Sequence, residues 1–139
     1  MSEFSDMKVA FGNALVSLVE NNRNIAVVDA DLMRISGTQV IMEKYADRYF
    51  QVGIAEQNLV GVAAGLSLTG RTVFATTFAN FISLRAADQI SNTVCYNNLN
   101  VKLCGIYAGI SSELNGGTHI SVSDVALMRS LPRMRVIDP

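Results

Sequence analysis

The sequence has no cluster of charge of one sign. Its 11 lysines and arginines and 12 aspartates and glutamates are mixed along 139 residues, and the formal net charge is -1. Nucleic-acid binding needs a basic patch that neutralises phosphates, so we expect no nucleic-acid partner. The acidic residues do not gather into a tail either.

Long apolar runs are also missing, and none approaches the length of a membrane-spanning helix. The first six residues are polar, and no apolar stretch of a signal peptide follows them. The two cysteines, Cys95 and Cys104, fit neither a CxxC motif nor a metal spacing. We therefore expect a cytoplasmic protein without a membrane partner, in which both thiols are buried and reduced.

Half of the residues are hydrophobic, so the chain can bury a sizeable core, and its length indicates one domain. Apolar residues at helical spacing predict a helix over residues 6–20, with Ser5 as its N-cap. Further helices are expected at 39–45, 55–68, 81–96 and 121–131. Gly70 would end the helix 55–68, and Ser121 or Ser123 would cap the last one.

Short apolar runs alternate with these helices. They predict strands at 24–29, 48–52, 72–76, 101–107 and 135–137. The alternation predicts an α/β fold, a doubly wound and mostly parallel sheet with helices on both faces. Because such a domain normally continues beyond a strand like the last one, we expect the chain to be truncated at its C-terminus.

Three predicted strand ends, where such sheets gather functional residues, carry side chains suited to chemistry. Glu56 opens a helix behind Gly53, where it could complement the helix dipole or exchange a proton with a ligand nitrogen. Phe78 and Phe81 could plug the core or stack on a flat heterocycle. The only histidine, His119, could be an ordinary surface or core residue, although its glycine-rich loop favours catalysis. Together they suggest a flat ligand beside an acid and an imidazole.

The order and spacing of these segments resemble a known family. The matching segments are Gly53-Ile54-Ala55-Glu56-Gln57-Asn58, Thr77-Phe78-Ala79-Asn80-Phe81, Gly116-Gly117-Thr118-His119 and Arg135-Val136-Ile137-Asp138-Pro139. Over nearly the whole chain they resemble the pyrimidine-binding domain of the transketolase family. That family includes transketolase, 1-deoxy-D-xylulose-5-phosphate synthase and the β subunits of 2-oxo-acid dehydrogenase E1 components. The resemblance implies that residues 1–139 are a single pyrimidine-binding domain, lacking the diphosphate-binding and C-terminal domains.

The resemblance also implies roles for individual residues. Glu56 would be catalytic, because it would hydrogen-bond N1′ of the aminopyrimidine of thiamine diphosphate and let the 4′-amino group act as a base. Phe78 and Phe81 would pack on the pyrimidine ring, and Asp31 would lie near the cofactor and the subunit interface. His119 would be catalytic and would hydrogen-bond substrate oxygens.

Two departures from the family concern the substrate. Asn115, which would contact the substrate, replaces an aspartate with which transketolases read a sugar hydroxyl, and a third aromatic residue is absent near Leu84. The chain also has no Gly-Asp-Gly motif for Mg²⁺. The resemblance therefore implies no metal ligand here, with Mg²⁺ held by a separate diphosphate-binding subunit, as in split transketolases.

The hypothesis that follows is one part of a thiamine-diphosphate-dependent transketolase, inactive as an isolated fragment. It would transfer a two-carbon ketol unit between sugars. Its partners would be the diphosphate-binding subunit, a sugar or sugar-phosphate substrate, and a second copy that forms a homodimer, as the small-residue helix after Glu56 also suggests. Two alternatives stay open: 1-deoxy-D-xylulose-5-phosphate synthase, and a non-catalytic interaction domain of the same fold. A 2-oxo-acid dehydrogenase β subunit is a weaker alternative.

Overall fold

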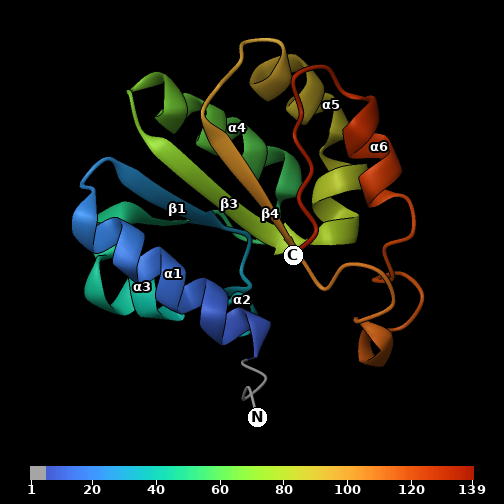
Figure 1. Cartoon of the computed structure of the whole chain (residues 1–139), viewed down its shortest axis with the longest axis horizontal. Coiled ribbons are helices and arrows are strands. Elements are labelled where there is room, and N and C mark those ends of the chain that lie inside the picture. Colours follow the sequence, from blue (N-terminus) through green and yellow to red (C-terminus); the bar gives the residue numbers. More distant parts are fainter. Residues whose placement is uncertain (1–5) are drawn as a thin grey trace.

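Four parallel strands form the sheet, in the order β2-β1-β3-β4 (Figure 1). The computed structural model describes residues 6–139. The strands are β1 (Ile25–Asp29), β2 (Tyr49–Gln51), β3 (Thr72–Phe78) and β4 (Val101–Ile106). In the register, Asp29 at the end of β1 lies between Gln51 of β2 and Thr76 of β3. The parallel sheet predicted from the alternation of helices and strands is confirmed.

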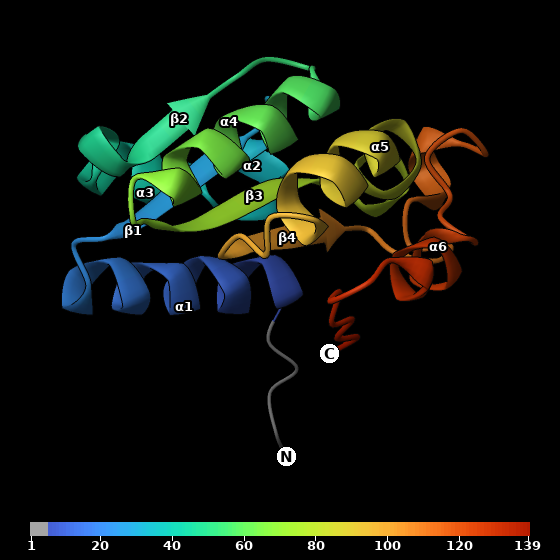
Figure 2. The same cartoon turned by 90° about the horizontal axis from the view of Figure 1, so that it is seen from above.

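Helices cover both faces of this sheet. They are α1 (Met7–Asn21), α2 (Met33–Ser36), α3 (Gln39–Lys44), α4 (Glu56–Leu68), α5 (Ala87–Gln89) and α6 (Asp124–Ser130), with short 3-10 turns η1 (Ala46–Arg48) and η4 (Glu113–Asn115) and π-helical segments η2 (Phe81–Arg85) and η3 (Ile90–Cys95). Figure 2 shows α1 on one side of the sheet and α4 with α5 on the other. The doubly wound arrangement is therefore the one that the sequence predicts.

Each face of the sheet packs a separate apolar core. On the α1 face the buried residues are Leu15, Val19, Ile25, Val27 and Ile41. The core on the α4 face includes Ala26, Val28, Leu59, Ala63, Val73, Ala75 and Ile90. Successive residues of a strand point to opposite faces, so a strand covered on both sides must be apolar throughout. This explains why β1 reads as a continuous apolar run.

Two helix ends differ from the prediction. Asp6 is the N-cap of α1, and its side chain accepts a hydrogen bond from the amide of Lys8, while Ser5 lies outside the described residues. α6 begins at Asp124, later than predicted; Ser123, one of the two predicted caps, is at its N-cap position, and Ser121 pairs with Gly109 in an isolated antiparallel bridge. Gly70 follows α4 with a φ of 88°, the left-handed conformation expected of a glycine that ends a helix.

The strand predicted at residues 135–137 is wrong. These residues carry no sheet pairing, and Ile137 is 85% exposed. A short β-branched run forms a strand only where a neighbouring strand edge and a covering layer meet it. Here the segment passes outside both cores.

The helix predicted over 81–96 exists, but two stretches of it are π-helical. The Ser83 hydroxyl donates to the carbonyl of Ala79 at 2.6 Å, and the Thr93 hydroxyl donates to the carbonyl of Gln89. Such side-chain bonds to a carbonyl four residues back compete with the helical ladder and bend it. π-helical turns are frequent at functional sites, and η2 begins at Phe81, the last residue of the predicted Phe78–Phe81 motif.

Two further expectations concern small and sulfur-containing side chains. Ala63 and Ala64 of α4 pack in the chain's own core, whereas Gly65 is exposed. Cys95 is buried as predicted, but Cys104, on the outer strand β4, is partly exposed because no further strand covers that edge. Both thiols are free, and burial raises the pKa of each.

Candidate active site

The sheet order reverses between β1 and β3. The chain leaves β1 toward α2 and α3, and it leaves β3 toward η2, on the other face. Loops that part in this way open a crevice at the carboxyl ends of the strands, which is where open α/β sheets bind ligands. Asp31, Glu56, Phe78, Phe81 and His119 come from loops or helix starts at this end of the sheet.

Glu56 is the first residue of α4, and its side chain is only 2% exposed. A carboxylate there faces the free amides of the helix N-terminus, which favour negative charge. Its charge partner is Arg85, whose Nη1 donates to Glu56 Oε2 at 2.9 Å. The structure thus buries a carboxylate and supplies one cation to balance it.

Arg85 ends η2, and its side chain remains 50% exposed. Its guanidinium carbon lies 4.1 Å from the centroid of the Phe81 ring, well inside the range of a cation–π contact. The sequence analysis missed this residue. The available signal was that Arg85 is the only basic residue in the helical segment 81–96.

Phe78, Phe81 and His119 form one cluster of rings. The ring centroid of His119 lies 5.1 Å from that of Phe78 and 4.9 Å from that of Phe81, both edge to face. The two phenylalanine rings are 5.5 Å apart, and Tyr107, at the end of β4, lies 5.8 Å from Phe78. The structure therefore brings together three of the residues singled out in the sequence, with Arg85 linking Phe81 to Glu56.

Two hydrogen bonds fix the position of His119. Asn80, between the two phenylalanines, donates from Nδ2 to the carbonyl of Thr118 at 2.9 Å, and Thr118 Oγ1 lies 3.0 Å from His119 Nδ1. The amide of Ser121 donates to the carbonyl of Gly109 at 2.9 Å and closes the base of the loop. Asn80 belongs to the motif Thr77-Phe78-Ala79-Asn80-Phe81, but nothing in that motif predicts its hydrogen bond to Thr118.

Asp31 follows β1 in a left-handed conformation with a φ of 65°. Its amide and that of Gly53, whose φ is 74°, both donate to Gln51 Oε1, at 2.9 and 2.8 Å. One side chain of β2 thereby joins the loop that carries Asp31 to the loop that leads into Glu56. Gln51 was not singled out in the sequence.

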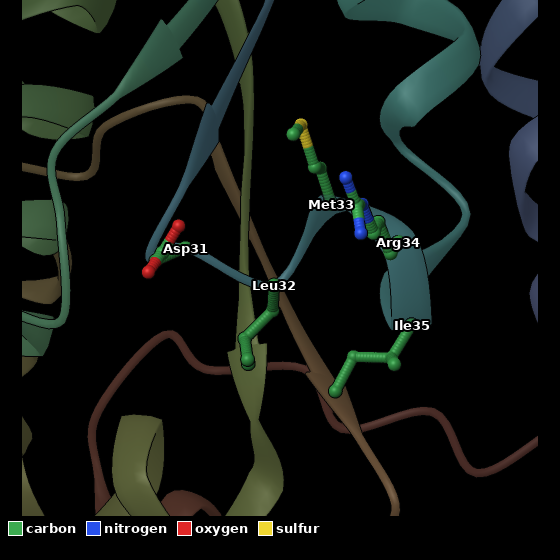
Figure 3. Close-up of a pocket in the computed structure, with 5 residues that line it drawn as sticks. All are labelled: Asp31, Leu32, Met33, Arg34 and Ile35. Carbon is green, nitrogen blue, oxygen red and sulfur yellow. The ribbon is translucent and has the colours of Figure 1, made fainter.

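A shallow pocket of about 310 Å³ lies beside Asp31, lined by residues 31–35. Figure 3 shows the Asp31 and Arg34 side chains on opposite sides of Leu32. Behind it, the buried Asp29 accepts hydrogen bonds from the Leu32 amide at 2.6 Å and the Thr38 hydroxyl at 2.9 Å. Burial raises the pKa of Asp29, although these hydrogen bonds oppose the rise. Asp29 thus shapes the segment that lines the pocket.

Asn115 stands apart from the ring cluster. Its Nδ2 donates to the Ser112 hydroxyl at 2.9 Å. Among residues 6–139, no hydrogen bond or aromatic contact joins Asn115 to Glu56, Phe78 or His119. The one side-chain hydrogen bond of Asn115 is therefore made within its own turn.

Two kinds of feature are absent from the described part of the chain. Among the side chains that the structure describes, no three His, Cys, Asp or Glu residues group in a way that could hold a metal ion. In the same range, every helix is too short or too polar to span a bilayer.

Comparison with known proteins gives consistent matches. The family described as transketolase, pyrimidine binding domain, matches residues 5–139. A protein named putative transketolase C-terminal section, from Methanocaldococcus jannaschii, is 40% identical over 136 residues, which are 98% of this chain and 43% of that protein. A 1-deoxy-D-xylulose-5-phosphate synthase from Gloeobacter violaceus is 40% identical over 129 residues, which are 93% of this chain and 20% of that enzyme.

Among solved structures, one described as a split gene transketolase, inactive beta4 tetramer, superposes with a TM-score of 0.76 at 47% sequence identity. The superposition covers 88% of this chain and 39% of that one. The chain thus spans about two fifths of the Methanocaldococcus relative and of the split transketolase, and a smaller part of the synthase.

Proposed function

The chain belongs to the family of transketolase pyrimidine-binding domains, and from this premise we propose that it supplies the pyrimidine half of a thiamine-diphosphate site for two-carbon ketol transfer between sugars. One observation carries the proposal. A carboxylate that is 2% exposed opens a helix at the ligand-binding end of the sheet and lies beside a cluster of aromatic rings. Buried carboxylates are costly unless something uses or balances them.

The residues present fit the aminopyrimidine of thiamine diphosphate. A flat heterocycle needs aromatic or apolar contacts on its plane, which Phe78 and Phe81 can provide. Its ring nitrogen needs a carboxyl group shielded from water, and Glu56, which lies beside the ring cluster through Arg85, meets the requirement. Asp31 would border the same ligand from the loop after β1. When bound, the cofactor supplies a nucleophilic thiazolium carbon.

The chain's own residues would then have separate tasks. Glu56 holds a proton in its hydrogen bond to N1′ of the pyrimidine, which is the contact that lets the 4′-amino group act as a base. Phe78 and Phe81 orient the ring and exclude water from the carboxyl group. His119, tied in place by Thr118 and Asn80, would hydrogen-bond a hydroxyl or carbonyl oxygen of the substrate. Asn115, whose Nδ2 donates to the Ser112 hydroxyl, would contact the same substrate from the glycine-rich loop.

Ketol transfer also needs groups that this chain does not supply. We propose that a separate diphosphate-binding subunit holds the diphosphate through Mg²⁺, and that residues 1–139 act as a single pyrimidine-binding domain, inactive alone. The similarity to a split transketolase and to a transketolase C-terminal section supports such a partner. We also propose that two copies pair through their pyrimidine-binding domains. The location proposed for this assembly is the cytoplasm.

A second function has a specific observation in its favour. The Gloeobacter relative is a 1-deoxy-D-xylulose-5-phosphate synthase, and Asn115 departs from the transketolase pattern. Synthase activity would use pyruvate and a triose phosphate in place of two sugars. The shared cofactor chemistry would leave the role of Glu56 unchanged, so the donor substrate separates the two functions.

Mixing the chain with its diphosphate-binding subunit tests the proposal. Thiamine-diphosphate-dependent ketol transfer should appear only with both subunits. Glu56→Gln should lower kcat by about 10²–10⁴-fold, the usual contribution of proton transfer by a positioned side chain. Glu43→Gln, a change at an exposed residue of α3, is the matched control and should keep full activity.

The donor decides between the alternatives. Turnover of pyruvate without any ketose donor would assign the chain to the synthase. No turnover with either donor, or full activity in Glu56→Gln, would leave a non-catalytic interaction domain as the better interpretation.

A further inference from the structure

Glu56 and Arg85 form an ion pair of unusual asymmetry. The Glu56 side chain is only 2% exposed. In the other two ion pairs among the side chains that the structure describes, the carboxylates belong to Asp6 and Asp47, and both are exposed. The guanidinium end is 50% exposed. The acid is therefore fixed in the protein, while its cation can turn into solvent without crossing the core.

The guanidinium occupies both contacts that an aminopyrimidine needs at the proposed site. It donates a nitrogen to Glu56 at 2.9 Å, and it lies over the ring of Phe81 at 4.1 Å. A guanidinium is planar and offers N–H donors at its edge, as does the amino edge of a pyrimidine. Arg85 therefore stands where a flat, nitrogen-rich ligand would be expected.

Arg85 and the ring cannot both hold Glu56 in the same way. A carboxyl group that shares a proton with a ring nitrogen is at least partly neutral, whereas a guanidinium at hydrogen-bond distance favours the ionised carboxylate. Without any partner, the same carboxylate would be a buried, uncompensated charge. In this structure Arg85 is the cation that balances Glu56, and a ring nitrogen that takes up the same oxygen, Oε2, would have to displace it.

We propose that Arg85 is a displaceable counter-ion, which balances Glu56 and covers Phe81 while the pyrimidine is absent and swings toward solvent when the ring takes its place. This inference rests on the proposed thiamine-diphosphate site and adds a positioning residue to it. The π-helical turn that ends at Arg85 holds the guanidinium beside the carboxylate, while the exposed half of the side chain leaves it a path outward.

The test compares Arg85→Met with the wild type in two measurements. Met keeps the apolar stem over Phe81 but carries no charge. The first measurement is the melting temperature of the chain without cofactor, which should fall by about 4 °C or more, because Glu56 loses its cation. The second is the Kd of thiamine diphosphate, measured by calorimetry on the chain assembled with its diphosphate-binding subunit and Mg²⁺. This Kd should fall at least about fivefold, because the ring no longer has to displace Arg85.

Three further variants make the result specific. Arg85→Lys keeps a charge without the planar edge and should give an intermediate Kd, and it serves if Arg85→Met does not fold. Arg129→Met removes an exposed arginine from α6 and should change neither quantity. In the Glu56→Gln background, Arg85→Met should leave the Kd unchanged, since no charge remains to be balanced.

The outcomes separate this inference from the function on which it rests. Weaker cofactor binding in Arg85→Met, with normal binding by the wild type, would mean that Arg85 stays on Glu56 in the complex, and would overturn the exchange alone. A Kd effect of equal size in the Glu56→Gln background would also overturn it. No cofactor binding by the wild-type assembly would remove the proposed function and the exchange together.

Discussion

A methyl group added at Gly105 should disturb the proposed site by displacing the backbone of a neighbouring segment. Gly105 lies in β4, opposite Thr77, where the chain leaves β3 and turns over the end of the sheet. A Cβ atom at this position would lie 2.9 Å from Ala79 Cα and 3.0 Å from Ala79 Cβ. Carbon atoms in contact are normally about 3.5–4.0 Å apart, so Ala79 would have to move by roughly half an ångström or more.

Two opposing contributions set the expected size of the effect. Overpacking of this kind costs about 1–3 kcal/mol, and here neither neighbouring atom can rotate away, because one is the Ala79 Cα and the other is the Cβ bonded directly to it. Replacing glycine by alanine also restricts the unfolded chain, which stabilises the fold by about 0.4–1 kcal/mol. Gly105→Ala should therefore lower the free energy of unfolding by about 1–2 kcal/mol, a loss of roughly 4–8 °C in melting temperature.

Urea unfolding followed by far-UV circular dichroism measures this change, which suits a chain without tryptophan. Gly65→Ala is the matched control, because Gly65 is exposed in α4 and nothing lies within 4 Å of an added Cβ. Alanine there should raise the free energy of unfolding by about 0.5–1 kcal/mol. If Gly105→Ala were as stable as the wild type while Gly65→Ala behaved as expected, the steric reasoning would be refuted. Because Ala79 separates Phe78 from Asn80, Gly105→Ala should also weaken cofactor binding by the assembled enzyme.

Two further stability predictions concern polar side chains near the proposed site. Burial raises the pKa of Asp29, so its carboxyl contributes stability below its ordinary value of 3.8 and loses that contribution as the pH rises through the raised value. Asp29→Asn should remove this part of the pH dependence, which urea unfolding at several pH values would reveal; an unchanged pH profile would contradict it. Gln51→Ala should cost about 0.5–1.5 kcal/mol, because the exposed amides of Asp31 and Gly53 lose their shared acceptor. Gln51→Glu keeps an acceptor oxygen and should cost less, so equal losses in the two variants would count against this role.

The sheet could be predicted from the sequence because its central strands are covered on both faces. β1 is apolar up to Asp29, and β3 combines apolar residues with β-branched threonines, a pattern that has few alternatives in a chain with intervening helices. The segment 135–137 has the same local character but pairs with no strand, and a local pattern cannot report whether pairing takes place. The bends in the helix 81–95 depend on the hydroxyls of Ser83 and Thr93 bonding back to the main chain, which composition alone does not indicate.

Part of the candidate site could be predicted because the carboxyl ends of parallel strands lie at the same edge of the sheet. Phe78 and His119 are 41 positions apart in the sequence, yet both follow neighbouring strands, and their rings meet. Arg85 could not be placed in this way, because its partner lies 29 residues earlier and the pair depends on how α4 packs beside η2. Asn115 was assigned from the family pattern alone, and the conformation of its short turn directs the side chain to Ser112 instead.

The bridge between Gly109 and Ser121 has a consequence for how this protein could change its substrate. The bridge closes the intervening segment at its base, and the hydrogen bond from Asn80 to Thr118 ties it to the ring cluster. The segment is therefore an exchangeable cassette. A homologous loop that keeps the two end residues and an acceptor for Asn80 could be transplanted without disturbing the sheet, α4 or Glu56. Evolution could then change the substrate contacts of the loop while the residues proposed to bind the cofactor stayed the same.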